Sequence, residues 1–482
     1  MPAINGEQYV ERVKKLNANI WIGGKKITGD ITEHYAFKGI IKSKSKLYDL
    51  QFDQAKKDIM TYLSPLTGER VGMTYLPPTS REDLEKRRLT TTEWARLSGG
   101  MMGRSPDYMN TAVMALGAAS DVFDGKEKFG MNIKRIYEQA RENDLTFSHT
   151  FVTPQNNRSL AFFEGEGEPI SARIVKADSD GLYIKGARLL ATQGGITDEI
   201  MVLPAGGKYI EDNYLYAFSI PSNTANIKFI CRESFAYNDS PFDHPLGSRF
   251  EEMDTIVVFD HTLIPWERVF LYKDYNIAMN MLSNTNFLTF LLHQAVTRQV
   301  VKSELLLGTA QLMAEMIDIS EYQHVKEKIS EIICGIEMMK GLLYSSEIEA
   351  KPDKRGLMVP ALNPLNVAIN TYPKLYPRFT EIIQLLGASG LICIPTEKDF
   401  DSSDLRPDLD LYLQGANANA KDRVQLFRLA WDMSLSAYGG RQTLYERFFF
   451  GDPVKLSSGL YFQYNKEHAI NLVNNLLKEE KD

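Results

Sequence analysis

The spacing of hydrophobic and polar positions divides the chain into three parts, and the first part is helical. Tyr9, Val13 and Leu16 recur on one face of a predicted first helix. The strongest helical pattern spans 80–97, where Ser80 precedes acidic residues in the first turn. We also predict helices at 36–41, 48–62, 106–120 and 126–143, with a β-turn region at 61–78. Residues 1–144 are therefore expected to form an N-terminal helical domain.

The pattern changes at Leu145, where the segment LTFSHTFV begins to alternate as a half-buried strand does. From there to about residue 269, short runs of β-branched and aromatic residues are separated by turns. These runs lie at 172–177, 181–190, 199–204, 215–221, 227–231 and 255–259. Residues 145–275 are therefore expected to form a middle β domain.

The third part, 276–482, is mostly helical again. Its periodicity predicts helices at 287–318, 321–348, 365–389, 421–436 and 465–481, with a linker rich in Pro and Lys at 350–364. Pro373 and Pro377 are expected to kink or restart the third of these helices. Several long helices joined by short connections predict a four-helix bundle, so the fold class is α+β.

Composition narrows the function without identifying it. The chain has 482 residues, of which 44% are hydrophobic and 24% charged, and its net charge is −7. An excess of acidic residues argues against nucleic acid or an anionic membrane as the main partner. Cys231, Cys334 and Cys393 are far apart and suggest neither a disulfide framework nor a C-x-x-C metal site. With no membrane-spanning run and no apolar core of signal-peptide type, a cytoplasmic protein is expected.

The stretch MMGRSPDYMN, residues 101–110, holds the most promising chemistry. Ser105 suits a helix N-cap and Pro106 suits the first helical position, so Arg104 would lie just before the helix and Tyr108 one turn inside it. Free N–H groups and an Arg at a helix start favour an oxyanion, carboxylate or phosphate. The alternative is an ordinary capped helix whose Arg pairs with a surface carboxylate.

Three further segments combine polar or aromatic residues in a way that suits a planar ligand. His149 lies in a predicted strand that leads into the amide-rich loop PQNNR at 154–158. Thr192 and Gln193 in ATQGGIT could donate hydrogen bonds, and YGGRQTLYERFFFGDP at 438–453 offers Arg441, Arg447 and a Phe run. The alternatives are a strand histidine satisfied within the fold, a hairpin turn, and a helix end with an aromatic plug. The seven His are scattered and suggest no metal site, and G-x-G-x-x-G is absent.

Together these segments and IPWERVFL at 264–271 resemble the 4-hydroxyphenylacetate 3-monooxygenase large-component family, in matching order from about residue 5 to 475. That family comprises two-component flavin-dependent phenol hydroxylases. The resemblance implies an acyl-CoA-dehydrogenase-like fold, with an N-terminal helical domain, a middle β-barrel or sandwich and a C-terminal four-helix bundle. It also implies a homotetramer that receives diffusible reduced FAD from a separate NAD(P)H-dependent flavin reductase.

The resemblance also assigns site residues. Arg104, Tyr108 and His149 match the residues that contact the phenolic oxygen of the substrate. The flavin contacts correspond to Gln155, Asn156, Asn157, Arg158, Thr192, Gly451, Asp452, Pro453 and Val454. The loop that reads the substrate carboxylate falls near 204–212, where Lys208 replaces the expected hydroxyl residues. The substrate is therefore 4-hydroxyphenylacetate or a related phenol, such as a chlorophenol.

The implied reaction is ortho-hydroxylation by a flavin C4a-hydroperoxide formed from reduced FAD and O2. Since a free phenol has a pKa of about 10, Arg104 would stabilise the phenolate, His149 would accept its proton and Tyr108 would orient its oxygen. Three alternatives remain. They are an enzyme like 4-hydroxybutyryl-CoA dehydratase, whose iron–sulfur cluster lacks cysteines near 99–110 here, an acyl-CoA dehydrogenase, and a non-catalytic flavin-binding protein.

Overall fold

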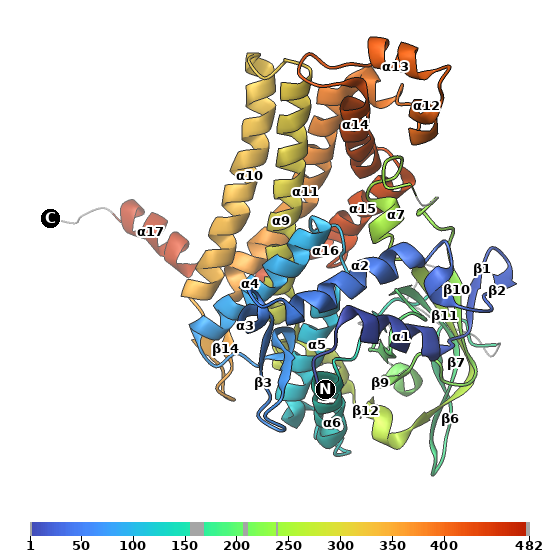
Figure 1. The fold of residues 1–482 in the computed structure, drawn as a ribbon. Helices are drawn as coiled ribbons and strands as arrows, with labels where there is room; N and C mark the ends of the chain where they lie inside the picture. The colour runs from blue at the N-terminus through green and yellow to red at the C-terminus, as the bar shows by residue number, and fades with distance from the viewer. Residues whose placement is uncertain (1, 155–167, 206–210, 238–239, 479–482) are drawn as a thin grey trace.

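The computed structural model describes residues 2–154, 168–205, 211–237 and 240–478. Helices come first, two β-sheets follow, and helices return, so the α+β class and the helix–β–helix order expected of an acyl-CoA-dehydrogenase-like chain are confirmed (Figure 1). The helices of the first part are α1 (Gly6–Leu16), α2 (Lys38–Asp49), α3 (Lys57–Met60), α4 (Arg81–Ser98), α5 (Pro106–Ala118) and α6 (Gly130–Asn143).

Local capping explains where the first helices begin and end. The Asn5 side chain accepts from the Gln8 backbone N–H in a capping box, and Ser80 accepts from Asp83 at the start of α4, as predicted. Gly99 ends α4 in the left-handed conformation. The predicted helices at 36–41 and 48–62 are found with different bounds, because α2 covers most of the first and runs into the second, which ends with the short helix α3. The expected turn region holds a hairpin, β3 (Thr61–Leu63) with β4 (Arg70–Gly72).

The β region contains a six-stranded sheet in the order β2-β1-β10-β11-β7-β6 and a four-stranded sheet in the order β12-β9-β8-β5. The strands of the first are β1 (Ile20–Ile22), β2 (Lys25–Lys26), β6 (Arg173–Ala177), β7 (Gly181–Thr192), β10 (Ile227–Cys231) and β11 (Asp254–Pro265). Those of the second are β5 (Phe147–Thr150), β8 (Glu199–Val202), β9 (Tyr216–Pro221) and β12 (Val269–Tyr272). Phe218 and Phe259 meet edge to face between the two sheets, with their ring centroids 6.1 Å apart.

Strands β1 and β2 belong to the N-terminal part of the sequence, yet β1 pairs in parallel with β10. The short strands at 20–26 were not expected, because three residues between turns carry little periodic signal. The division into domains 1–144, 145–275 and 276–482 remains a prediction.

The C-terminal part is built on four long helices that lie side by side (Figure 1). They are α9 (Phe287–Met316), α10 (Gln323–Ile348), α11 (Leu362–Gly387) and α14 (Ala420–Ser434). α11 continues through both Pro373 and Pro377. The expected linker holds a small hairpin of β13 (Lys351–Pro352) and β14 (Met358–Val359). The shorter helices are α7 (Gly247–Phe250), α8 (Tyr275–Asn284), α12 (Glu397–Asp401), α13 (Arg406–Tyr412), α15 (Ala437–Phe448), α16 (Pro453–Gln463) and α17 (Glu467–Leu477).

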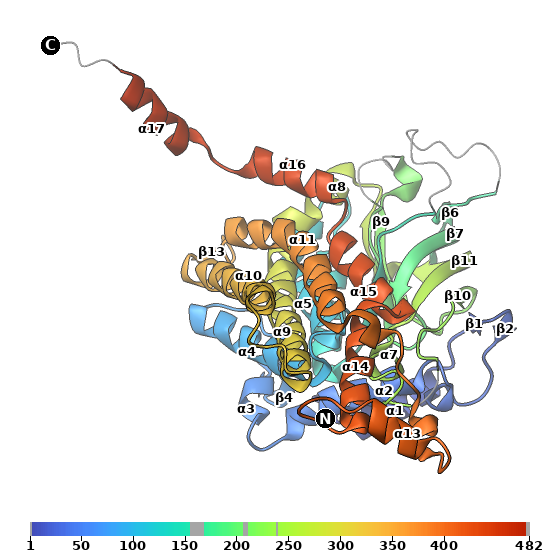
Figure 2. The same ribbon diagram turned by 90° about the horizontal axis from the view of Figure 1, so that it is seen from above.

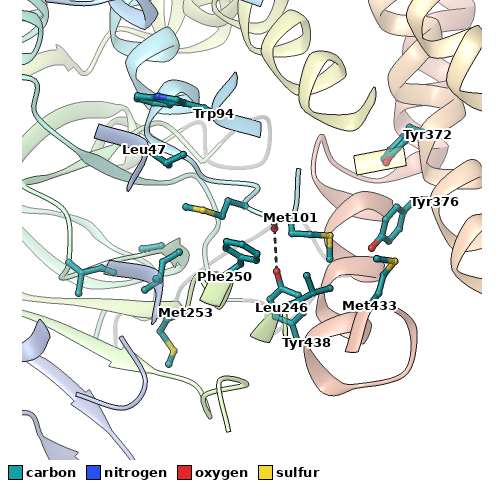
Figure 3. Close-up of a cluster of buried hydrophobic side chains, with 14 of the residues drawn as sticks. Leu47, Trp94, Met101, Leu246, Phe250, Met253, Tyr372, Tyr376, Met433 and Tyr438 are labelled. Carbon is teal, nitrogen blue, oxygen red and sulfur yellow. Dashed lines mark hydrogen bonds between the residues drawn. The ribbon is translucent and has the colours of Figure 1, made fainter. Parts of the chain in front are cut away.

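The main hydrophobic core runs from the first helices through the β region to the bundle. Figure 3 shows Met101 at a junction, with Trp94 and Leu47 on one side and Tyr438 and Met433 on the other. The Tyr438 hydroxyl donates to the Met101 carbonyl over 3.5 Å. The loop that precedes α5 is therefore packed between parts of the chain that are far apart in sequence. Within the described ranges, no helix is long and apolar enough to cross a membrane.

Candidate functional site

The loop 99–104, which leads into α5, follows a narrow path between α9 and α15. A Cβ on Gly100, whose φ is +71°, would lie 2.7 Å from the backbone N of Lys302. A Cβ on Gly103 would lie 2.4 Å from the ring of Tyr445. These distances are shorter than any ordinary carbon contact, so both positions require glycine for the backbone to come this close.

The backbone N–H groups just before α5 are bound by a carboxylate of the protein itself. Glu252, which is fully buried, accepts from the N–H of Gly103 at 2.9 Å and from the N–H of Arg104 at 2.6 Å. The expectation that free N–H groups here await an external oxyanion is therefore wrong for these two groups. Ser105 is the N-cap residue and Pro106 the first helical residue, as predicted, but the Ser105 side chain makes no capping hydrogen bond, and its hydroxyl donates to Asp107 at 2.5 Å.

The Arg104 side chain lies among three aromatic rings, those of Tyr108, Tyr445 and Phe449, which we call the aromatic cage. Its guanidinium carbon is 4.4 Å from the ring centroid of Tyr108 and 4.3 Å from that of Phe449. One terminal nitrogen donates to the Tyr445 hydroxyl at 2.7 Å, while Nε is buried and has no hydrogen-bond partner among the residues that the structure describes. In the described part of the chain, no carboxylate forms an ion pair with Arg104. The alternative of a surface ion pair is therefore wrong.

His149 lies next to this cage, as the sequence predicted. It is on β5, is buried, and has its ring centroid 5.5 Å from that of Tyr108 and 5.3 Å from that of Phe151. Burial and the nearby positive charge of Arg104 hold the pKa of His149 well below its usual value of 6.5. Burial raises the pKa of Tyr108, although Arg104 acts in the opposite direction. The histidine and the tyrosine are therefore both neutral at physiological pH.

Thr192 ends β7 close to Asp254, the first residue of β11, and its hydroxyl donates to that carboxylate at 2.8 Å. Asp254 is also bound by Arg441, at 2.8 and 3.0 Å. The expectation that Thr192 donates to a ligand is therefore wrong in this arrangement. Its hydroxyl oxygen can still accept a hydrogen bond.

Gln193 connects the Thr192 turn to the loop before α5. Its side-chain nitrogen donates to the Arg104 carbonyl at 2.9 Å and to Glu252 at 3.2 Å. Its side-chain oxygen accepts from Nζ of Lys44 at 2.9 Å. The sequence suggested Gln193 as a ligand donor, but both ends of its amide are used within the protein.

The remaining predicted residues are placed differently. Arg441 is held by Asp254 and by Glu252, the latter at 3.3 Å, so it is not free for a phosphate. Gly451 to Val454 lie at the exposed start of α16, where Asp452 caps the N–H of Val454. No contact between described residues joins them to Arg104 or Thr192. Gln155, Asn156, Asn157, Arg158 and Lys208 lie outside the described residues.

Sequence reasoning missed two residues that the structure brings to the site, Tyr445 and Glu252, whereas Phe449 comes from the Phe run that the sequence had indicated. Tyr445 and Phe449 are four positions apart on one helix face, a spacing that could have pointed to a shared role. Glu252 carries no such signal, because the residues that it binds are almost 150 positions away.

The fold and the site together define an α+β protein with a partly buried arginine that pairs with no described carboxylate and lies beside aromatic rings and a buried histidine. Comparison with known families then shows that the chain belongs to the 4-hydroxyphenylacetate 3-hydroxylase family. The model of the family's N-terminal part matches residues 5–271, and that of its C-terminal part matches residues 278–478.

Curated relatives match over the whole chain. A probable 4-hydroxyphenylacetate 3-monooxygenase of Bacillus subtilis is 52% identical, with 100% of each chain covered. The 4-hydroxyphenylacetate 3-monooxygenase oxygenase component of Thermus thermophilus is 44% identical over 99% of this chain and 98% of its own.

Solved structures match equally well. The crystal structure of a 4-hydroxyphenylacetate 3-monooxygenase oxygenase component complexed with FAD and 4-hydroxyphenylacetate superposes with a TM-score of 0.93. It is 44% identical, and 98% of each chain is covered. An archaeal 4-hydroxybutyryl-CoA dehydratase of N. maritimus, 18% identical, covers 100% of this chain and 96% of its own with a TM-score of 0.88, which shows a shared fold alone.

Proposed function

We propose that this chain is the oxygenase component of a two-component monooxygenase that adds one oxygen atom ortho to the hydroxyl group of a phenol, with 4-hydroxyphenylacetate as the first candidate. The observation that carries the proposal is the arrangement around Arg104. A positive charge that pairs with no carboxylate in the described ranges lies beside a neutral histidine and a neutral tyrosine, and the family to which the chain belongs supports this use of it.

Each of the three residues has a different role in activating the phenol. Arg104 stabilises the negative charge on the phenolic oxygen, which raises the electron density at the ortho carbon. An imidazole nitrogen of neutral His149 accepts the hydrogen bond from the phenol and takes its proton as the charge develops. Burial and Arg104 lower the pKa of His149 before substrate binds, and a phenolate beside the imidazole would favour the protonated form again. The Tyr108 hydroxyl fixes the position of the phenolic oxygen.

The residues present fit a reduced flavin. The hydroxyl of Thr192, whose proton is committed to Asp254, offers only an acceptor, and reduced isoalloxazine carries N–H donors. Thr192 and the segment Gly451 to Val454 are proposed to hold FAD, together with Gln155, Asn156, Asn157 and Arg158. When bound, reduced FAD supplies the activation of O2. The protein supplies a buried, aromatic environment that keeps water from the reacting groups.

The assembly and the partners belong to the same proposal. An oxygenase component requires a separate flavin reductase as its source of reduced FAD, and we propose that both act in the cytoplasm. A homotetramer is supported by α16 and α17, which lead away from the body of the protein (Figure 2). Phe462 and Leu476 on these helices are 80% and 79% exposed in the single chain. Exposed apolar surface of this kind is typical of a protein–protein interface.

We also propose that Lys208 binds the carboxylate group of the substrate.

An aerobic assay tests the proposal. The protein is mixed with FAD, NADH, a generic flavin reductase and catalase, and is offered 4-hydroxyphenylacetate, phenol or a chlorophenol. We expect one substrate to gain the mass of one oxygen atom. NADH oxidation that yields only peroxide with every phenol would contradict the substrate class. Absence of any flavin-dependent effect would contradict the enzyme class.

A further inference from the structure

The hydroxyl group of Tyr445 on α15 accepts one hydrogen bond and donates another. The oxygen accepts from a terminal nitrogen of Arg104 at 2.7 Å, and the hydroxyl donates to the Gly103 carbonyl at 3.0 Å. Arginine can only donate and a carbonyl can only accept, so the direction of both hydrogen bonds is determined. Burial raises the pKa of Tyr445 far above its usual value. The phenol therefore stays neutral.

The ring of Tyr445 is held on two sides. It stacks on Phe449 with the centroids 4.7 Å apart and the planes at 26°, and it lies against Gly103, where no Cβ would fit. Phe449 in turn contacts Arg104. The last turn of α15 thus holds the guanidinium by one hydrogen bond and two ring faces.

Two described carboxylates of neighbouring elements, those of Glu252 and Glu446, are bound to groups other than the Arg104 side chain. Glu252 holds the backbone N–H groups of residues 103 and 104 and is paired with Arg441. Glu446, which follows Tyr445 in sequence, is paired with Arg298 and Lys302, each at 2.8 Å. A carboxylate in the place of the Tyr445 hydroxyl would neutralise Arg104, whereas a phenol fixes its orientation and leaves its charge intact.

We propose that Tyr445 is a positioning residue, which orients Arg104 through a neutral acceptor and so reserves its positive charge for the phenolate oxygen of the substrate. This inference rests on the proposed function. It concerns a residue that contacts Arg104 and not the reacting atoms. The prediction is that loss of the Tyr445 hydroxyl weakens the preference of the site for phenolate without loss of the fold.

The test uses 4-nitrophenol, whose phenolate is coloured, so that its ionisation on the purified protein can be followed by absorbance during a pH titration. In the unaltered protein, we expect the pKa of the bound probe to lie below that of the free probe, and Arg104→Ala should abolish this difference. Tyr445→Phe should raise the pKa of the bound probe by about one unit, in line with a weakened charge-assisted interaction.

Tyr438→Phe is the matched control. Tyr438 lies on the same helix, and its hydroxyl also donates to a carbonyl of the same loop, that of Met101, but it does not contact Arg104. The control should leave the pKa of the bound probe unchanged. If Tyr445→Phe lowers only the melting temperature and leaves that pKa unchanged, Tyr445 is merely structural and the inference is wrong, while the proposed function stands. If the unaltered protein neither binds the probe nor lowers its pKa, the proposed function and the inference both fail.

Discussion

At the scale of single residues, the site is organised around a positive charge that forms an ion pair with no described carboxylate. Arg104 is enclosed by Tyr108, Tyr445 and Phe449, and its neighbour His149 is kept neutral by burial and by the guanidinium itself. A carboxylate in contact with Arg104 would offset the positive charge on which a phenolate depends. The alternative interpretation of the sequence, an arginine in a surface ion pair, is wrong because Arg104 pairs with no described carboxylate.

Removal of this charge gives the first prediction. Arg104→Ala should lower kcat/KM for the phenol by roughly 30- to 1000-fold, which corresponds to about 2–4 kcal/mol of lost transition-state stabilisation. Steady-state kinetics with a coupled reductase measure the effect. Arg96→Ala, on the exposed surface of α4, is the control and should leave kcat/KM unchanged. An Arg104→Ala enzyme that keeps its full kcat/KM would contradict the assigned role.

Lys44 gives the second prediction, which concerns stability. Burial lowers the pKa of this lysine from 10.5 to about 7, even though Asp198 and Glu252 act in the opposite direction. Between about pH 7 and 10.5 the unfolded chain binds a proton at Lys44 that the folded protein does not bind, so this residue makes stability rise with pH. Lys44→Met should remove this contribution. Urea unfolding of both proteins from pH 7 to 10 measures it, and a stability difference that stays constant with pH would contradict the assignment.

At the scale of secondary-structure elements, the start of α5 is held in place by β11, β7 and α15. Glu252, just before β11, binds the backbone of Gly103 and Arg104, while Gln193, just after β7, binds the Arg104 carbonyl. The same two elements carry Asp254 and Thr192, which lie in the proposed flavin site. The geometry on the flavin side and that on the substrate side therefore depend on one hydrogen-bonded network.

Glu252→Gln tests this connection. An amide can accept from one of the two N–H groups but presents its own N–H to the other, so the loop should shift and Arg441 should lose a charged partner. We expect a lower melting temperature and a fall in kcat/KM of at least tenfold. Glu251→Gln is a matched control, because Glu251 is also buried but pairs with Arg232 and does not contact the loop. A similar fall in kcat/KM for both variants would show that general destabilisation is the cause.

At the scale of the whole molecule, the C-terminal helices stand out. α16 contacts the body through α11, for example by the hydrogen bond from Asn366 to Gln463 at 3.1 Å, whereas every described residue of α17 is exposed. Ile470, Val473 and Leu477 recur at helical spacing on α17 and form an apolar face. Such a face gains free energy only when another surface covers it.

A chain shortened to end after Lys466 should therefore assemble less than the full chain. Light scattering coupled to size-exclusion chromatography measures the mass in solution, and we expect the shortened protein to shift to smaller species. Replacement of Ile470, Val473 and Leu477 by Ser tests the apolar face without shortening the chain. Unchanged assembly in both variants would show that the arm is not part of the oligomer interface.

The sequence by itself determined the helix–β–helix order, the long helices and the family. The helices expected at 80–97, 287–318, 321–348 and 421–436 are found as α4, α9, α10 and α14, with ends that differ by at most two residues. It also indicated Arg104, Tyr108 and His149 as a group, because the segments that contain them match a family pattern. The structure confirms that these three lie together.

Only the tertiary structure decided what surrounds these residues. β1 and β2 join a sheet built mainly from strands about 200 positions away, Glu252 occupies the N–H groups that looked free, and Tyr445 and Phe449 reach Arg104 across more than 340 positions. Local pattern records the face that a residue buries and not the partner against which it packs. Whether a charged side chain is paired within the protein or is available to a ligand depends on that partner. This is why Arg104 could be named from the sequence but its availability could be seen only in the fold.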